Sequence, residues 1–363
     1  KTGMFTSPHL VDFRERIQVQ GDMISKEDTM RLGNRLLSMD FGVYPTMFDY
    51  CLAMALLYFK EQKCDVVILE TGLGGTYDST NACGVPDVTV IAKIGFDHMA
   101  ILGDTLAKIA AEKAGIIKHG TALVLESQEK EAMDVLNKSA ERADIKTTKV
   151  VNLDEIRILP QKDGKQCFSY AGYDAVTMKM LGVHQYENAV AAMLAAELFF
   201  EKYFAGKKNV PERKALQHAI REGIDRTQWM GRMELVSNDP FFLMDGAHNS
   251  NGVEALKKSL ETMYPDEKFH FIMGVMADKD YGEMIRELLP LALDFKTVTV
   301  ESERALQGEA LADCIREKGI PAEAYQNLAD VLPDFSKSSA EKTVAFGSLY
   351  FIGEIEAFLQ GKQ

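Results

Sequence analysis

Residues 65–81 read Asp65-Val-Val-Ile-Leu-Glu-Thr-Gly-Leu-Gly-Gly-Thr-Tyr-Asp-Ser-Thr-Asn81, an apolar run followed at once by a glycine-rich turn. The run Val66–Leu69 is rich in β-branched residues, which is typical of a strand buried on both faces of a parallel sheet. Glu70 directly follows this run. Because ligands of open α/β sheets bind beyond the carboxyl ends of the strands, we expect Glu70 to lie at a binding site. Taken alone, the segment fits a tight turn with a solvated glutamate equally well.

Length and composition restrict the class of protein. A chain of 363 residues is too long for one ordinary domain, so two hydrophobic cores are expected. The net charge of −13 argues against a surface that binds nucleic acid or anionic membranes. No apolar run approaches membrane-spanning length. Five scattered cysteines without a CxxC pair favour reduced thiols in the cytoplasm over a disulfide or zinc framework.

Two more candidates follow the central segment. Val88–Ile94 is predicted to form a second buried strand, and His98 comes soon after it, on the same edge of the sheet as Glu70. A helix predicted over Leu106–Ala114 carries Lys113 among alanines, where partial burial would favour a neutral, nucleophilic amine. A solvated histidine and a surface lysine that extends its amine into water are the alternatives.

Candidates also occur nearer the N-terminus. Ser7 follows a predicted strand end, and its hydroxyl is a hard oxygen ligand of the kind that Mg²⁺ prefers, although a turn serine explains it as well. Thr46 is expected to cap a helix from Met47 to Phe59. Near the start of this helix, Phe48 and Asp49 either line a pocket or serve packing and the helix dipole.

The second half of the chain changes pattern twice. Between Lys146 and Leu181, short alternating segments predict a small antiparallel insertion. A long helix then opens at His184, with Asn188 in its first turn, where the amide either faces a ligand or supports the cap. Residues 226–234 read as a linker and include Arg232.

From Phe241 onward, strands and helices alternate as in a doubly wound α/β domain. Asp245 and His248 flank the first turn from strand to helix in this region. A phosphate group would bind at such a turn, because the N-terminus of a helix attracts anions.

Taken in order, these segments resemble the folylpolyglutamate synthase and dihydrofolate synthase family of the Mur ligase superfamily. Each motif alone is a weak signal, whereas the ordered set is specific and extends almost from end to end. The motifs are Thr6-Ser-Pro-His9, Glu70-Thr-Gly-Leu-Gly-Gly75, Asp78-Ser-Thr-Asn81, Gly95-Phe-Asp-His98, Leu102-Gly-Asp-Thr105, Glu112-Lys-Ala-Gly-Ile116, His184-Gln-Tyr-Glu-Asn-Ala189, Gly231-Arg-Met-Glu234, Asp245-Gly-Ala-His-Asn249 and Phe346-Gly-Ser348.

The resemblance implies a fold and an activity. The α/β fold would have a Mur-ligase-like central ATPase-type domain with a mostly parallel sheet over residues 1–228. A Rossmann-like, doubly wound glutamate ligase domain would follow over residues 229–363. The activity would be the ATP-dependent addition of L-glutamate to a folate or dihydropteroate carboxylate through an acyl phosphate. The enzyme would be a cytoplasmic monomer that binds these small molecules and neither nucleic acid nor membranes.

The resemblance also implies roles for particular residues. Glu70, His98 and Lys113 would be catalytic, and Lys113 would be carbamylated. Mg²⁺ would be held by Ser7, Glu70 and His98. ATP would be contacted by Asn188, Arg232, Asp245 and His248. The pterin ring would be bound by Thr46, Phe48, Asp49 and Tyr77.

The sequence departs from the family pattern in two respects. The glycine-rich phosphate-binding loop that ends in Gly-Lys-Ser or Gly-Lys-Thr has no counterpart upstream of Ser7, so we expect the chain to be an N-terminally truncated fragment. Thr76-Tyr77 stands where relatives often have Arg-Leu, and Met230 where many have proline. Two alternatives remain open, another Mur-type amide ligase and a nucleotide-binding fragment that is inactive without the upstream loop.

Overall fold

The structure is a computed structural model that describes residues 1–162 and 164–361. It divides the chain into two compact units, Lys1–Lys149 and Val150–Gln363. This division lies well before the predicted domain boundary at residue 228. Part of the reason is that the segment after residue 149 packs with the C-terminal residues, since Leu181 is buried in the same apolar cluster as Phe271 and Val344. The boundary at 228 stays a prediction.

The first unit begins with a four-stranded sheet in the order β3-β2-β1-β4. Its strands are β1 (Thr2–Phe5), β2 (Ile17–Val19), β3 (Asp22–Met23) and β4 (Val66–Leu69). The pairing of β1 with the edge strand β4 is parallel, and β2 and β3 continue the sheet in antiparallel fashion. Helices α1 (Lys26–Leu37) and α2 (Met47–Glu61) share a core with this sheet that includes Phe5, Ile17, Leu32 and Phe59. The cap at Thr46 confirms the predicted start of α2, and Ser25 caps α1 in the same way.

Strand β4 differs from the expectation in its burial. It was predicted to be buried on both faces, but the side chains of Val67 and Ile68 are 40% and 54% exposed. The reason is that β4 is the last strand of its sheet and pairs only with β1. An unbroken apolar run therefore indicated the strand correctly but not its position in the sheet.

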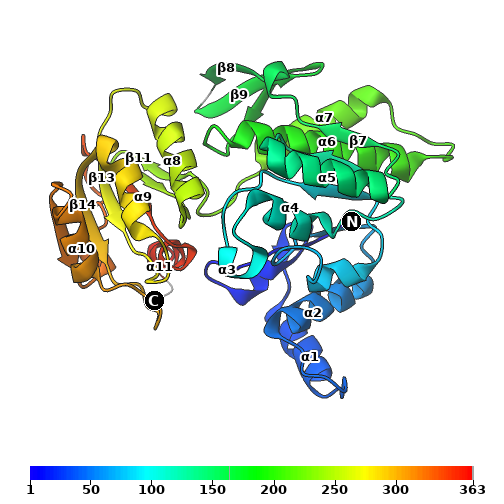
Figure 1. Cartoon of the computed structure of the whole chain (residues 1–363), viewed down its shortest axis with the longest axis horizontal. Helices are drawn as coiled ribbons and strands as arrows, with labels where there is room; N and C mark the ends of the chain where they lie inside the picture. Colours follow the sequence, from blue (N-terminus) through cyan, green and yellow to red (C-terminus); the bar gives the residue numbers. More distant parts are fainter. Residues whose placement is uncertain (163, 362–363) are drawn as a thin grey trace. The chain divides into compact units, whose positions relative to one another are not determined.

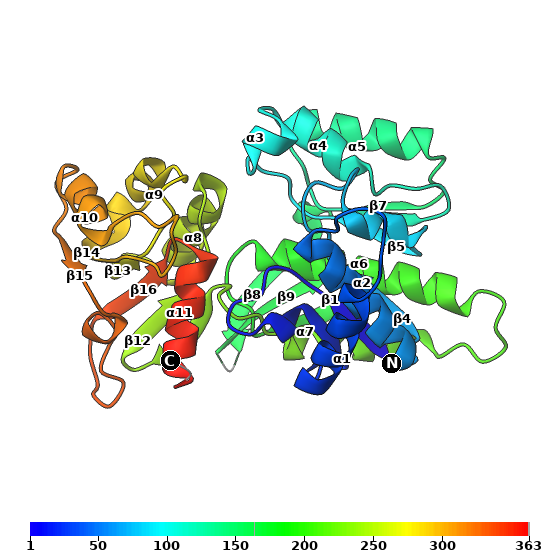
Figure 2. The ribbon, with the colours of Figure 1, turned by 90° about the horizontal axis from the view of Figure 1, so that it is seen from below.

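The remainder of the first unit is a second, smaller sheet with helices beside it. The sheet order is β5-β6-β7, and β5 and β6 are parallel. Figure 2 shows the helices of this part side by side along the sheet. Buried residues of these elements, such as Ile109, Leu123 and Leu136, form their own core. The elements are β5 (Val88–Ile91), α3 (Met99–Leu102), α4 (Leu106–Ala114), β6 (Ala122–Leu125), α5 (Lys130–Arg142) and β7 (Thr148–Val150).

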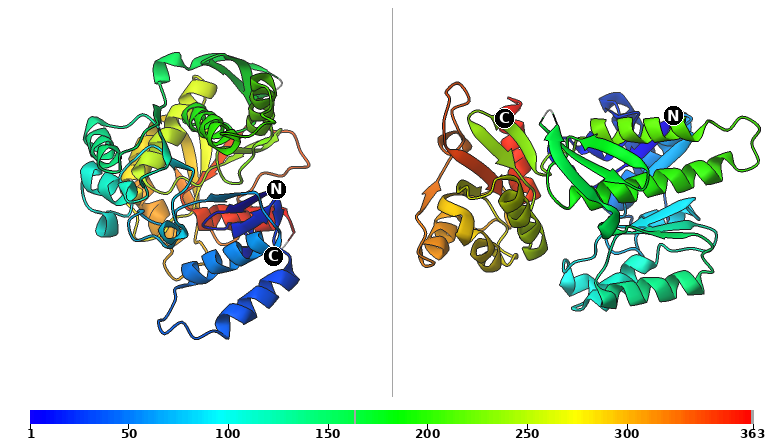
Figure 3. Two further views of the ribbon diagram at one scale, coloured as in Figure 1. Left: turned by 90° about the vertical axis from the view of Figure 1, so that its right-hand side faces the viewer. Right: turned by 90° about the horizontal axis from the view of Figure 1, so that it is seen from above.

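The second unit opens with the antiparallel insertion that the sequence predicts. Its strands β8 (Arg157–Lys162), β9 (Lys165–Tyr170) and β10 (Tyr173–Met178) form one antiparallel sheet in the order β10-β9-β8. Helices α6 (Gln185–Phe204) and α7 (Arg213–Arg226) follow, and α7 packs against β10 (Figure 3). The predicted antiparallel insertion is therefore confirmed.

The C-terminal sheet has six strands in the order β11-β12-β16-β13-β14-β15. All of its pairings are parallel except that of β11 with β12. Residues of α8, α9 and α10 are buried with one face of the sheet, and residues of α11 with the other (Figure 1). The strands are β11 (Glu234–Asn238), β12 (Phe241–Met244), β13 (Phe269–Met273), β14 (Ala292–Val298), β15 (Ala322–Tyr325) and β16 (Lys342–Phe346). The helices are α8 (Ser250–Met263), α9 (Tyr281–Leu288), α10 (Gly308–Arg316) and α11 (Leu349–Leu359).

This arrangement confirms the doubly wound C-terminal half and corrects some details. The sequence pattern also predicts a strand over Thr297–Val300, whereas the strand observed there, β14, runs from Ala292 to Val298; β11 and β15 were not predicted. β15 was missed because its short sequence, Ala-Glu-Ala-Tyr, lacks a β-branched run. Within the described residues, no helix is long and apolar enough to cross a bilayer.

Candidate functional site

Two of the predicted metal ligands meet at the end of the first sheet. Because β1 and β4 are parallel and in register, Ser7 and Glu70 follow strand ends that lie side by side. The Ser7 backbone N–H donates to Glu70 Oε2 at 2.7 Å, and the Glu70 N–H donates to the Phe5 carbonyl at 2.9 Å. The family resemblance groups these two residues, and the structure brings them into contact, while their role as metal ligands stays a prediction. The observed contact uses the backbone of Ser7.

The loop after Ser7 is held in place by the half-buried carboxylate of Glu15. Glu15 accepts hydrogen bonds from the backbone N–H groups of Leu10, Val11 and Asp12, at 2.7, 2.9 and 2.6 Å. Three N–H donors to one carboxylate are a strong restraint, because each bond to a charged acceptor is stronger than a neutral one. The backbone that presents Ser7 is thus held by Glu15, which the sequence did not single out.

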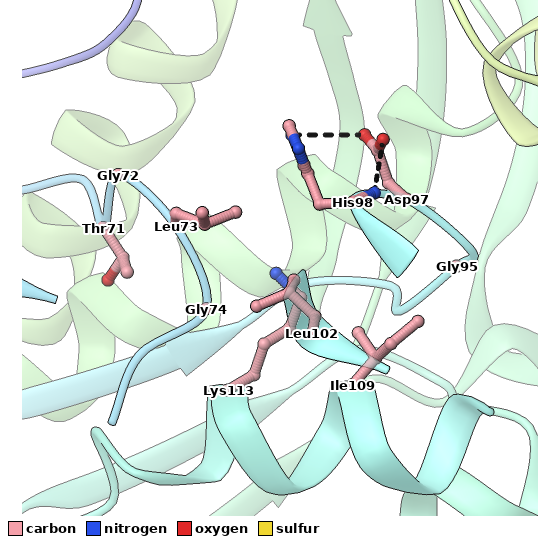
Figure 4. Close-up of a pocket in the computed structure, with 10 residues that line it drawn as sticks. All are labelled: Thr71, Gly72, Leu73, Gly74, Gly95, Asp97, His98, Leu102, Ile109 and Lys113. Carbon is pink, nitrogen blue, oxygen red and sulfur yellow. Dashed lines mark hydrogen bonds and ion pairs between the residues drawn. The ribbon is translucent and has the colours of Figure 1, made fainter. Parts of the chain in front are cut away.

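The glycine-rich turn, His98 and Lys113 line a single pocket. Its lining comprises Thr71, Gly72, Leu73, Gly74, Gly95, Asp97, His98, Leu102, Ile109 and Lys113. Figure 4 shows the Lys113 side chain rising from α4 into this pocket, with Asp97 and His98 on its far side. Thr71, which is next to Glu70 in the chain, belongs to the same lining. The glycine-rich turn, the segment of His98 and helix α4 are therefore brought together. His98 was expected on the same sheet edge as Glu70, but the strand before it, β5, belongs to a different sheet from β4, and Glu70 itself is not part of the pocket lining.

The environment of Lys113 favours its neutral form. Burial lowers the pKa of the Lys113 amine below its ordinary value, and the nearby Asp97 carboxylate opposes that shift. His98 sits in the left-handed region at φ 49°, and its N–H donates to Asp97 Oδ1 at 2.8 Å. A non-glycine residue in this region is uncommon and is found where the surrounding structure requires it. Asp97 thus connects the histidine and the lysine of the pocket.

The chemistry of these donors suits a divalent cation. Glu70, Asp97 and the Ser7 hydroxyl are hard oxygen donors of the type that Mg²⁺ prefers, and His98 supplies an imidazole. In residues 1–162 and 164–361, no three His, Cys, Asp or Glu side chains gather closely enough to form a metal centre by themselves. The predicted set of Ser7, Glu70 and His98 contains only two residues of those types, so it stays a prediction.

The predicted pterin segment at the start of α2 is held by a polar network. Thr46 and Asp49 form a reciprocal capping box, in which the Thr46 N–H donates to Asp49 Oδ2 at 2.7 Å. The Ser79 hydroxyl donates to the other oxygen, Asp49 Oδ1. Hydrogen bonding from Ser79 and then Thr46 lowers the pKa of the Asp49 carboxyl. Asp49 therefore joins the α2 cap to the loop that follows the glycine-rich turn.

Phe48 and Tyr77 behave differently from each other. The Phe48 ring lies so close to Gly72 that a Cβ on this glycine would be 2.7 Å from two ring atoms. Phe48 also makes an edge-to-face contact with Phe5, with ring centroids 5.5 Å apart. Tyr77 is 90% exposed. The structure thus packs Phe48 against the glycine-rich turn and leaves the Tyr77 side chain in solvent.

In the second unit, Asp245 fixes the segment that carries Arg232. The carboxylate of Asp245 is buried and accepts the Met233 N–H at 2.8 Å and the Ala247 N–H at 2.9 Å. Burial raises the pKa of Asp245, while the Met233 N–H, the charge of Arg232 and the Ala247 N–H act in the opposite direction. His248 Nδ1 lies 2.8 Å from the Gly246 carbonyl, which orients the ring. Residues 231–234 and 245–248 are therefore one connected site.

The start of α6 adds His184 to this group. Burial, followed by the charge of Arg232, lowers the pKa of His184 to about 4. His184 Nε2 lies 3.1 Å from Gln185 Nε2, and the Asn188 side chain donates to Gln185 Oε1 at 2.9 Å. Asn188 itself is exposed. The sequence predicts His184 only as the start of a helix. Its position in the same motif as Asn188 was the signal that could have marked it as a site residue.

The lowered pKa of His184 predicts acid sensitivity. Above pH 6.5 the histidine is neutral in both the folded and the unfolded chain, so it has no effect on the pH dependence. Between pH 6.5 and about 4 the unfolded chain binds a proton that the folded chain does not, so the free energy of unfolding falls, by on the order of 3 kcal/mol in total. We expect His184→Gln to flatten this acid slope.

The measurement is urea unfolding at pH 7 and pH 5 for the wild type and for His184→Gln. His218→Gln is the control, because His218 is an exposed histidine on α7 and should leave the slope at the wild-type value. Equal acid slopes in all three proteins would show that His184 is not buried in its neutral form.

Comparisons with protein families identify the class of protein. The model "Mur ligase middle domain" matches residues 44–196, and the model "Mur ligase, glutamate ligase domain" matches residues 231–346. The first match includes Glu70, His98, Lys113 and Asn188, and the second includes Arg232, Asp245 and His248. The two matched regions are therefore those of a Mur ligase, and the candidate residues lie within them.

Individual relatives narrow this class. The chain is 35% identical over 376 residues to dihydrofolate synthase/folylpolyglutamate synthase of Bacillus subtilis, covering 99% of this chain and 84% of that protein. The corresponding Mycobacterium tuberculosis protein is 32% identical, with 92% and 72% covered. The chain belongs to the dihydrofolate synthase/folylpolyglutamate synthase family.

Solved structures agree with this assignment. Folylpolyglutamate synthase from Thermotoga maritima superimposes with a TM-score of 0.82 at 28% identity, covering 100% of this chain and 83% of that one. The Mycobacterium tuberculosis enzyme complexed with ADP and AMPPCP gives 0.83 at 29% identity, covering 100% and 85%. The predicted α/β fold, a Mur-ligase-type part followed by a doubly wound part, is confirmed.

Proposed function

We propose that this protein is an ATP-dependent ligase that joins L-glutamate to the carboxylate of a folate or of dihydropteroate. In this reaction ATP phosphorylates the carboxylate, and the glutamate amine displaces phosphate from the acyl phosphate. The observation that carries the proposal is the pocket in which Lys113 and His98 lie beside the glycine-rich turn after Glu70, in a chain of this family. Solved relatives bind the matching ligands, since one Escherichia coli structure of 25% identity holds ADP with DHPP.

A divalent cation, Mg²⁺ in the first instance, would be held by Ser7, Glu70 and His98. The support is the short contact between Ser7 and Glu70 and the position of His98 on the neighbouring pocket wall. When bound, such a cation reduces the repulsion between a carboxylate and the triphosphate that must approach it. Glu70 and Asp97 would provide the negative charge that retains the cation.

Lys113 would add to that charge as a carbamate. Its amine has a lowered pKa and points into the pocket, so a fraction of it is neutral and able to react with CO₂. The product exchanges a cation for a carboxylate-like anion beside Asp97 and His98. A lysine that remained protonated would instead repel the proposed cation.

ATP would be contacted by Asn188, Arg232, Asp245 and His248. Arg232 supplies the guanidinium, which suits phosphate oxygens because it donates in a planar fork. Asp245 would act by holding the backbone next to Arg232, since its oxygens accept the Met233 and Ala247 N–H groups. The pterin would be bound by Thr46, Phe48, Asp49 and Tyr77. In this arrangement Thr46 and Asp49 would hold Phe48 in place, and Tyr77 would be an exposed contact.

The cellular location that fits these substrates is the cytoplasm. All five cysteines, Cys51, Cys64, Cys83, Cys167 and Cys314, are free thiols in the structure. Unpaired cysteines are usual where thiols are kept reduced.

The test is a coupled assay of ADP formation with L-glutamate and either dihydropteroate or tetrahydrofolate, confirmed by mass spectrometry of the product. It uses the 363-residue chain and a version with additional N-terminal residues, since this chain covers 84% of the Bacillus subtilis relative. Product one glutamate heavier than the substrate supports the proposal. Turnover only with cell-wall nucleotide precursors, or ATP binding without turnover in both versions, would refute it.

Arg232→Ala tests the ATP assignment. We expect the KM for ATP to rise about tenfold, the size of one lost charge-assisted contact, while the KM for the folate substrate stays within twofold. Arg226→Ala is the matched control, because Arg226 is exposed and pairs with Glu222 at 2.6 Å. If ATP kinetics are unchanged and only the melting temperature falls, Arg232 is a structural residue of its segment.

A further inference from the structure

The C-terminal end of α4 is capped by the glycine-rich loop. The last carbonyl groups of a helix lack partners within the helix and need others. The carbonyl of Glu112 accepts two bonds from Thr76, one from the backbone N–H at 2.9 Å and one from the hydroxyl at 3.1 Å. Its bond from the Gly115 N–H is longer, at 3.3 Å. Thr76 is therefore the better partner of the residue that immediately precedes Lys113.

The backbones of the glycine-rich loop and of the end of α4 are in direct contact. A Cβ on Gly75 would lie 2.8 Å from the Glu112 carbonyl oxygen and 2.9 Å from that of Lys113. A Cβ on Gly115 would lie 2.7 Å from the Thr76 nitrogen. Real Cβ atoms do not approach backbone atoms so closely, so both glycines are needed for this contact. The loop and the end of α4 thus form one rigid joint.

Asn81 links the glycine-rich loop to the end of α4 by hydrogen bonds. Its Nδ2 group donates to the Thr76 carbonyl at 3.2 Å and to the Gly115 carbonyl at 3.1 Å, so that one side chain binds both segments. Lys118 in turn donates to the carbonyl groups of Asn81 and Gly84, the latter at 2.7 Å. The position of Asn81 is therefore fixed as well.

We propose that Thr76 and Asn81 are positioning residues that hold Lys113 in its pocket by fixing the end of α4 to the glycine-rich loop. The inference deepens the proposed function and rests on it, because it assigns these residues to the placement of the reactive lysine. Neither side chain lines the pocket itself. Thr76 is exposed, so the loss of its hydroxyl removes one hydrogen bond and leaves the core intact.

The test compares Thr76→Val, which keeps the shape and loses the hydroxyl, with Thr76→Ser, which keeps the hydroxyl. We expect Thr76→Val to lower kcat at least about fivefold, since small displacements of a reacting group are costly, with KM for ATP and folate within twofold. Raised bicarbonate should restore part of kcat, and Thr76→Ser should stay within twofold of the wild type. Asn81→Ala should reproduce the effect of Thr76→Val.

The control is Thr29→Val, which removes a hydroxyl bonded to the Ser25 carbonyl at 2.8 Å on α1, away from the pocket. Hydrogen exchange of residues 112–117 is measured in the same variants and should accelerate in Thr76→Val and Asn81→Ala but not in Thr76→Ser or Thr29→Val. An unchanged kcat together with unchanged exchange overturns the proposal, as does an equal loss of kcat in Thr29→Val. If the wild type lacks ligase activity, the proposed function fails. Faster exchange of residues 112–117 in Thr76→Val, together with altered reactivity of Lys113 toward an amine reagent, would still support the positioning role of Thr76. Unchanged exchange and unchanged reactivity would refute it.

Discussion

Glu70→Ala should reduce ligase turnover by about a hundredfold or more at ordinary Mg²⁺ concentrations, with a melting temperature near that of the wild type. The size follows from the loss of charge compensation between two anions, which is among the largest single contributions that enzymes make. Stability should change little, because Glu70 lies at a strand end and keeps its backbone N–H bond to Phe5, although the side-chain bond from the Ser7 N–H is lost.

Glu70→Gln separates the charge from the hydrogen bond. The amide oxygen of glutamine can still accept the Ser7 N–H, which lies 2.7 Å from Glu70 Oε2, but the negative charge is lost. We therefore expect Glu70→Gln to be as inactive as Glu70→Ala, and high Mg²⁺ to restore part of its turnover. Glu141→Ala, an exposed glutamate of α5, is the control and should keep full activity. Normal turnover in Glu70→Gln would mean that Glu70 only anchors Ser7.

Local signals in the sequence predicted much of the fold because they act over a few residues. Thr46 and Thr105 each cap a helix that starts where the sequence indicates, since capping depends only on the residues up to three positions ahead. The order of strands does not follow from such signals. For β4, burial depends on which neighbours the strand acquires, and its apolar run gave no information about that.

The candidate site was predictable where the topology of the sheet determines it. Ser7 and Glu70, which the family resemblance assigns to one metal site, follow parallel strands that end together, and they are in contact. Partners that arise from folding of distant segments were not predictable. Asp49 was proposed as a pterin ligand, yet its Oδ1 accepts the hydroxyl of Ser79, thirty residues along the chain. In the same way, nothing in the helix Leu106–Ala114 indicates that Thr76 caps its end.

Lys113→Ala should lose most activity, by about a hundredfold, and small carboxylates should restore part of it. The reason is the proposed carbamate, which forms when the neutral amine attacks CO₂ and a new N–C bond is made as the amine proton leaves to solvent. Acetate or formate in the vacated space would replace the lost anion. Lys113→Arg should be equally impaired and should not be rescued, because the guanidinium keeps a positive charge beside the proposed cation.

The matched control is Lys108→Ala, since Lys108 lies on the same helix but is 63% exposed and pairs with Asp104 at 2.8 Å. The carbamate itself is measurable by NMR of protein equilibrated with ¹³C-bicarbonate, where Lys113→Ala should lose a signal that Lys108→Ala keeps. Burial lowers the pKa of Lys113, so the neutral, reactive fraction at a given pH is larger than for a lysine of ordinary pKa. Near-normal rates in Lys113→Arg would exclude the carbamate, because arginine forms none. If Lys113→Ala and Lys113→Arg both lose activity, and the ¹³C signal appears only in proteins that contain Lys113, then Lys113 carries the carbamate.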